Sequence, residues 1–215
     1  MTPPRPPNTS AERLAAAAPR TWQRMLSGRR LNLIEPSPLD IEIEDIALGL
    51  ARNTRWNGQT KGPHAWSVAQ HSDLVVDIVR KLKPRATARL LMAAKLHDAS
   101  EYVTHDLITP LKAAVGDVFK ELEARLTRAV FLRFGLPATL STADKVLIKK
   151  ADHIAAATEA VQLAGFSEKE CRSVLNFKEK PLKHVKLEPV PTAEAERIFL
   201  VGFHQLEKAL KLEIR

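Results

Sequence analysis

Apolar residues recur every three or four positions over most of the chain that follows residue 66. This spacing is typical of amphipathic helices, and it predicts them over 68–82, 119–134, 146–164 and 198–210. Ser67 is a residue type that caps helix N-termini, and Lys83-Pro84 ends the first of these patterns. Leu90–Leu96 is almost entirely apolar and predicts a buried helix, while His184–Leu187 suits a short strand. The repeated β-branched runs of a parallel sheet are absent, so the sequence predicts an all-α fold.

The pattern is weaker before residue 66. Residues 1–20 have four prolines among the first seven positions and few large apolar residues, which is typical of a partly disordered arm. The stretch 21–38 is irregular but contains Trp, Leu and Ile, so we expect it to pack on the body of the protein. Asp40–Glu44 alternates in a way that suits a short strand or a helix entry, and 46–52 looks helical. We therefore expect an arm over 1–20 and one helical domain over 21–215.

Length and composition are ordinary for a globular domain. The chain has 215 residues, of which 45% are hydrophobic and 27% charged. Its single cysteine, Cys171, excludes a disulfide framework and a cysteine-based zinc or iron–sulfur site. No apolar run reaches the roughly 18 residues of a membrane span, and no apolar segment of a secretory signal follows Arg5. We therefore expect a cytoplasmic location.

The net charge of +8 favours an anionic partner. Basic residues are scattered rather than massed, and aromatic residues make up only 5%, too few for a platform that stacks single-stranded nucleic acid. We therefore expect a small anionic substrate. A nucleic acid partner is left open but is not favoured, and no membrane partner is expected. A homodimer is compatible with the apolar faces of the end helices.

Polar residues that suit metal binding fall at positions that face the predicted core. His71 lies on the inward side of its predicted helix. His97 and Asp98 follow the buried segment, and Asp152 comes one turn after Ile148. A carboxylate buried without a partner is costly, and one divalent cation bound by two imidazoles and two carboxylates would compensate that cost. Pairing of the aspartates with Arg or Lys is the alternative, and spacing alone does not decide between them.

Two further carboxylates lie close to this set in the sequence. Glu101 is four residues after His97 and shares its face if the helix continues. There it could take a proton from a water bound to the ion, although a surface position is commoner for a helical Glu. Asp106 could bond a sugar hydroxyl or simply make a turn. Pro110, which follows Thr109, is expected to break the helix.

Three local signatures resemble the HD-domain superfamily of metal-dependent phosphohydrolases, and within it the bacterial 5′-deoxynucleotidases. They are RWNGQTKGPHAWSVAQHS at 55–72, KLHDASEYVTHDLITPLK at 95–112 and KKADHIAAATEA at 149–160. A His-Asp pair alone is unspecific, but the HDASE run with its downstream Asp and Thr-Pro and its upstream Arg-Trp is specific. The resemblance covers about residues 40–165 and implies a multi-helix HD-domain bundle.

The resemblance also implies roles for individual residues. It implies that one divalent ion (Mn, Co, Mg, Fe, Ni or Zn) is held by His71, His97, Asp98 and Asp152. It implies two catalytic residues, Asp98, which is also a ligand, and Glu101, which moves a proton. It assigns contacts with the phosphate, base and sugar of the substrate to Arg55, Trp56, Asp106, Thr109 and Lys112.

The reaction implied by the resemblance is hydrolysis of a deoxynucleoside 5′-monophosphate. His105 departs from the family pattern, in which a small glycine-like residue is common before the aspartate. Three alternatives stay open. They are a deoxynucleoside triphosphate phosphohydrolase with the same site, a non-catalytic module that binds nucleic acid or regulates, and a structural role in which the aspartates form salt bridges.

Overall fold

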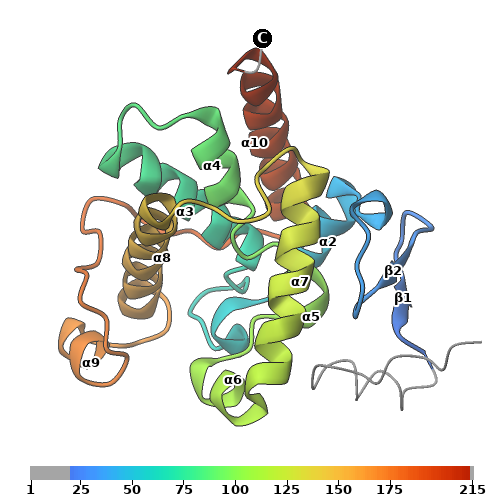
Figure 1. Cartoon of the computed structure of the whole chain (residues 1–215). Coiled ribbons are helices and arrows are strands. Elements are labelled where there is room, and N and C mark those ends of the chain that lie inside the picture. Colours follow the sequence, from blue (N-terminus) through green and yellow to red (C-terminus); the bar gives the residue numbers. More distant parts are fainter. Residues whose placement is uncertain (1–19, 214–215) are drawn as a thin grey trace, which may run out of the picture.

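The computed structural model describes residues 20–213, and most of this part is helical (Figure 1). The helices are α2 (Ile43–Arg52), α3 (Val68–Leu82), α4 (Ala88–Lys95), α5 (Glu101–Thr104), α6 (Thr109–Val115), α7 (Asp117–Arg133), α8 (Thr142–Gln162), α9 (Glu168–Ser173) and α10 (Thr192–Glu213). Two short 3₁₀ helices, η1 (Pro38–Asp40) and η2 (Arg55–Gly58), and one hairpin, β1 (Trp22–Arg24) and β2 (Arg30–Asn32), accompany them. The predicted mostly helical class is confirmed. Except for Arg20, the predicted arm over 1–20 lies outside the described residues.

Side-chain caps fix where the helices of the central bundle begin. Ser67 Oγ accepts a hydrogen bond from the backbone N–H of Gln70, which confirms the predicted start of α3. Thr87 and Ser141 cap α4 and α8 in the same way. Each cap contributes about 1 kcal/mol. It also sets the register of the side chains that follow on its helix.

The core lies where α3, α4 and α10 meet. Helix α3 packs against α4 and α8, and α10 packs across α2, α3 and α4. Leu50, Val75, Met92 and Phe199 are fully buried there, and the predicted burial of Leu90–Leu96 is confirmed. In the described residues, none of the helices is long and apolar enough to cross a membrane.

A buried ion pair ties three of these helices together. The side chain of Lys95 on α4 is fully buried, and its ammonium group contacts the carboxylate of Asp73 on α3. The same ammonium lies 4.0 Å from the centre of the Phe199 ring on α10. Gly202 of α10 leaves room for it, because a Cβ at that position would lie 3.1 Å from Lys95 Nζ.

One expectation about local structure is wrong, and one element was not predicted. No strand forms at 184–187, where the chain is a connector between α9 and α10. The hairpin of β1 and β2 is an element that the hydrophobic pattern did not predict, since each strand has only three residues. The alternating segment Asp40–Glu44 forms the entry to helix α2, which is one of its two predicted structures.

The chain between α4 and α6 also differs from expectation. Helix α4 does not continue to Glu101, because 96–100 form turns and Glu101 starts the separate helix α5. That helix ends at Thr104, and His105 after it has a φ of +63°, a value that favours glycine. Pro110 lies in the first turn of α6, where proline is favoured, and so begins a helix rather than breaking one.

Candidate metal centre

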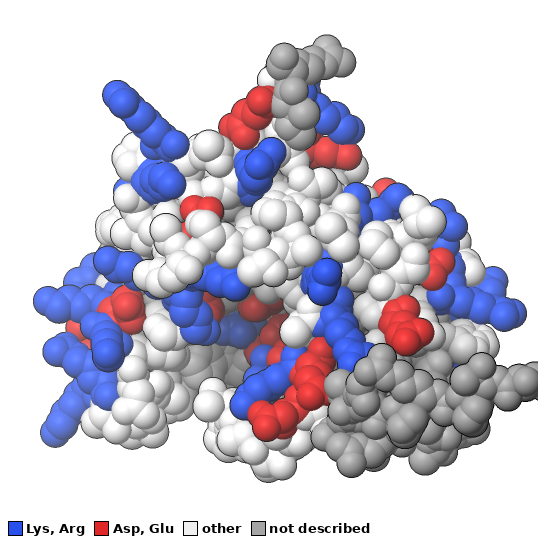
Figure 2. Space-filling model, in the orientation of Figure 1, with Lys and Arg blue, Asp and Glu red and all other residues white. Residues whose placement is uncertain are grey.

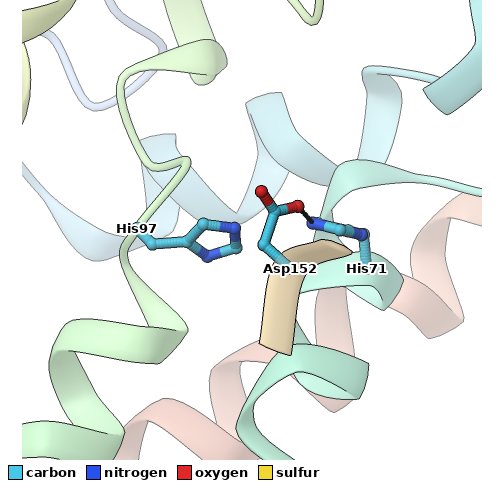
Figure 3. Close-up of side chains that lie close together, drawn as sticks. All are labelled: His71, His97 and Asp152. Atoms are coloured by element: carbon cyan, nitrogen blue, oxygen red, sulfur yellow. Dashed lines mark ion pairs between the residues drawn. The ribbon is translucent and has the colours of Figure 1, made fainter. Parts of the chain in front are cut away.

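The structure brings the four predicted ligands together from three segments. His71 lies on α3, His97 and Asp98 lie in the turn after α4, and Asp152 lies on α8. His71 Nε2 is 3.3 Å from Asp152 Oδ1 and 3.5 Å from Asp98 Oδ2, and His97 Nε2 is 3.2 Å from the same Asp98 oxygen. Ligand atoms of His71, His97 and Asp152 lie within 4.8 Å of one another, and Figure 3 shows the three side chains converging.

Hydrogen bonds orient both imidazole rings. His97 Nδ1 lies 2.8 Å from the carbonyl oxygen of Ala94, which can only accept, so Nδ1 carries the proton. His71 Nδ1 lies 2.6 Å from Oε1 of Glu159, a buried carboxylate. Each ring therefore presents Nε2 to the centre of the cluster. Metal-ligating histidines are oriented in this way by a carbonyl or a carboxylate on the other ring nitrogen.

The donor set fits a divalent ion. The Nε2 atoms of His71 and His97 are both buried, and neither has a hydrogen-bond partner in the part of the chain that the structure describes. Buried polar atoms without a hydrogen bond are rare, because the hydrogen bonds that they made with water are not replaced. Two imidazoles and two carboxylates suit divalent first-row transition metals, and the carboxylates also suit Mg²⁺.

The charges at this centre favour a bound cation. Burial and Arg55 lower the pKa of His71, but Glu159 and Asp152 outweigh them and raise it to about 10. Burial raises the pKa of Asp98, yet the neighbouring His97 brings it below its ordinary value. The pKa of Asp152 is likewise low, since His71 outweighs the effect of burial. The two aspartates therefore remain ionised, and their negative charges stabilise a cation placed between them.

The alternative of pairing with Arg or Lys holds for one oxygen only. Lys149 Nζ lies 2.7 Å from Asp152 Oδ2, and 65% of the lysine side chain is exposed. Oδ1, the oxygen of Asp152 that faces His71, is left for a ligand bond. Within residues 20–213, Asp98 forms ion pairs with histidines alone. No lysine or arginine of this part takes the position between the four side chains.

Glu159 is a site residue that sequence reasoning missed. It is fully buried on α8, and its Oε2 accepts hydrogen bonds from Trp56 Nε1 at 3.1 Å and Arg55 Nε at 3.3 Å. Burial raises the pKa of the Glu159 carboxyl, but the effect of His71 and Arg55 is larger and lowers this pKa to about 2. The available signal was its place seven residues after Asp152, two turns along an Ala-rich buried face.

Glu101 lies beside the cluster in a buried position among other charged groups. Its side chain is nearly fully buried, and Lys112 Nζ lies 3.3 Å from Oε1. Oε2 is buried and has no hydrogen-bond partner in the described residues. Burial, followed by the charges of Asp98 and Asp106, raises the pKa of this carboxyl well above its ordinary value. A carboxyl group with a raised pKa is suited to accept and donate a proton near neutral pH.

The other predicted substrate residues divide into two groups. Arg55 Nη1 lies 2.9 Å from Asp106 Oδ2, so Arg55, Trp56 and Asp106 form one polar cluster with Glu159. The Trp56 ring also contacts the ring of Phe166, 5.8 Å away between centroids. Thr109 is exposed at the start of α6, outside that cluster. Their contacts with a nucleotide remain predictions.

A cavity of about 650 Å³ opens beside the metal ligands. Its lining includes His97, Asp98, Asp152, Glu101 and Lys112, but none of the other predicted substrate residues. Figure 2 shows this face of the molecule hollowed at its centre, with acidic and basic side chains together in and around the hollow. The arrangement suits an anionic ligand that reaches a metal ion at the acidic floor.

Comparison with known proteins gives two bacterial relatives of this chain. No family model matches the chain. The uncharacterized protein RCAP_rcc00048 of Rhodobacter capsulatus is 50% identical over 194 residues, which are 89% of this chain and 98% of that protein. The uncharacterized protein YfdR of Escherichia coli K12 is 33% identical over 136 residues, 63% of this chain and 68% of YfdR. The chain therefore belongs to the family that contains RCAP_rcc00048 and YfdR.

Proposed function

We propose that the protein is a metal-dependent phosphohydrolase that releases phosphate from a nucleotide. The observation that supports the metal ion most directly is the pair of buried Nε2 atoms of His71 and His97, which have no hydrogen-bond partner in the described residues and lie 3.5 Å and 3.2 Å from a carboxylate oxygen of Asp98. The resemblance to HD-domain phosphohydrolases supports the reaction. It implies a deoxynucleoside 5′-monophosphate first, with a deoxynucleoside triphosphate as the alternative, and we propose the cytoplasm as the compartment.

The side chains around the cavity suit phosphoester hydrolysis. A divalent ion, when bound by the four ligands, would lower the pKa of water and draw charge from a phosphate oxygen. In the reaction the oxygen of a water bonds to phosphorus, the ester P–O bond breaks, and the water's proton passes to the released alcohol. Glu101 suits the transfer of that proton, because its Oε2 is free of partners in the described residues and its pKa is raised. Lys112 fixes the orientation of its other oxygen.

A phosphate-release assay with a panel of nucleotides tests the proposal. Wild-type protein is assayed with Mn²⁺, Co²⁺ or Mg²⁺ and with a chelator, and its metal content is measured by mass spectrometry. We expect activity that requires the ion, and Asp98→Ala should lose both the ion and the activity. Asp77→Ala is the matched control, because Asp77 is 62% exposed on α3 and pairs only with Arg80 among the described residues.

The roles of ligand and proton carrier are separated by a second variant. Glu101→Gln should keep the ion and lose about 100-fold or more in turnover, the effect typical of a missing general acid or base. Metal-loaded wild-type protein that releases no phosphate from any nucleotide would reject the reaction but not the metal centre. Polynucleotide binding that weakens steeply with salt, without turnover, would favour the non-catalytic alternative.

A further inference from the structure

The cavity beside the metal ligands has a second wall that no predicted role explains. Phe131 of α7 and Ile148 of α8 are buried apolar side chains in its lining, and Leu140 lies on the loop between these helices. The volume of about 650 Å³ is within the range of cavities that hold small organic ligands. An apolar wall near charged groups suits a ligand with both an organic part and anionic groups.

The basic side chains of this cavity outnumber the acidic ones. Five cationic and four anionic side chains line it, and a divalent ion would add two further positive charges. Three of the cations have protein partners, namely Lys112, Lys149 and Arg125. The other two, Arg128 and Lys145, form no ion pair or side-chain hydrogen bond with any residue between 20 and 213. These two cations are therefore available to an anion in the cavity.

The available cations lie away from the metal ligands. Lys145 is on α8, seven residues before Asp152, which places the two on one face and about 10 Å apart along the helix axis. Arg128 is on α7, one turn before Phe131. A single phosphate group held at the metal centre does not extend over such a length. A ligand that uses both ends of the cavity therefore carries a second anionic group.

We infer that Arg128 and Lys145 form a second anion subsite, which binds a phosphate group beyond the one held at the metal centre. The inference rests on the proposed function and, of the two substrates named there, favours the deoxynucleoside triphosphate over the monophosphate. The planar guanidinium of Arg128 can donate two parallel hydrogen bonds to phosphate, and Lys145 supplies a mobile point charge.

Binding measurements test the subsite apart from the reaction. Deoxyadenosine 5′-monophosphate and 5′-triphosphate are titrated calorimetrically, with Mg²⁺, into the Glu101→Gln protein, in which slowed turnover should leave the nucleotide largely intact during the titration. Arg128→Gln and Lys145→Gln are then added singly to this background. We expect each to weaken binding of the triphosphate about tenfold, and that of the monophosphate less than twofold. Lys150→Gln is the matched control, since Lys150 is an exposed lysine of α8 outside the cavity lining.

The outcomes separate the two proposals. An equal loss for both nucleotides would overturn the subsite, because it would indicate only a general effect of charge. Unchanged affinities, a loss of the same size in Lys150→Gln, or no binding of the triphosphate at all would overturn it as well. Phosphate release by the wild-type enzyme is scored independently. The subsite is therefore supported when triphosphate affinity depends on Arg128 and Lys145, even if the wild type releases no phosphate.

Discussion

Nδ1 of His71 lies 2.6 Å from Oε1 of Glu159, and both side chains are fully out of contact with solvent. The carboxylate fixes the ring orientation and raises the basicity of Nε2. Loss of such a partner typically costs a metal site 10- to 100-fold in affinity. We therefore expect Glu159→Gln to weaken metal binding by about that factor, measured by competition with a coloured chelator.

The control for this prediction is Glu207→Gln, on the surface of α10. Its exposed carboxylate contacts His204 and Lys211, and metal affinity should not change. Circular dichroism at the assay temperature checks that the Glu159 variant is folded, because this residue also accepts hydrogen bonds from Arg55 and Trp56. Wild-type affinity in a folded Glu159→Gln protein would refute the orienting role.

The pH dependence of turnover should report on Glu101. As a base it must be ionised, so activity falls as the pH drops through its pKa, which burial, Asp98 and Asp106 raise and Lys112 lowers. Lys112→Met removes that cation and should move the acidic limb of the kcat/KM profile to higher pH. Lys112→Arg keeps the charge and should leave the limb near its wild-type position. An unmoved limb in Lys112→Met would assign the titration to another group.

The close approach of α2 and α5 should not tolerate a side chain at position 49. A Cβ on Gly49 would lie 2.7 Å from the Cβ and 2.8 Å from the carbonyl oxygen of Tyr102, and backbone atoms cannot rotate away. We expect Gly49→Ala to lower the free energy of unfolding in urea by about 2 kcal/mol or more. Gly202→Ala is the comparison, since its Cβ would meet the flexible end of Lys95 and should cost less. Equal stabilities of the two variants would contradict this packing.

The backbone at His105 should store strain that glycine relieves. His105 has φ +63° and ψ 160°, a region populated almost only by glycine, and its side chain is exposed. His105→Gly should therefore raise the free energy of unfolding by about 1 kcal/mol. His105→Ala removes the same imidazole but keeps the strain, so it should not stabilise. Equal effects of the two substitutions would trace the change to the side chain.

The effects of Lys95 and Asp73 on the free energy of unfolding should depend strongly on each other. Asp73→Asn leaves the fully buried Lys95 ammonium without its counter-charge and should cost about 3 kcal/mol of unfolding free energy. The double variant with Lys95→Met should recover part of this loss, because no buried charge is left. Asp77→Asn, at an exposed pair with Arg80, should change stability by less than about 1 kcal/mol. Additive effects of Asp73→Asn and Lys95→Met would mean that the two groups do not interact.

Sequence periodicity predicted the parts of this molecule in which neighbours in the chain determine the structure. Ser67 and the apolar spacing behind it define α3, so His71 could be placed on the buried face. Asp152 could be placed on α8 by the same argument, and the two residues do approach each other. Periodicity cannot show contacts between distant segments. Arg55 meets Glu159 across 104 residues, and no local pattern indicates that a carboxylate engages this arginine.

The hairpin and the region around Glu101 escaped prediction for a different reason. Strands of three residues are too short for alternation to stand out. The turn at 96–100 interrupts a segment that is apolar enough to continue as a helix. Tertiary packing decides there, since the turn allows Glu101 and Asp98 to reach the same cavity.

The contact of the Lys95 ammonium with Asp73 and Phe199 has a consequence for the two histidine ligands. It joins α3 and α4, which lead to His71 and His97, to a helix that ends at Glu213. Close-packed interiors transmit strain, so a disturbance of this one contact should reach both imidazole ligands at once.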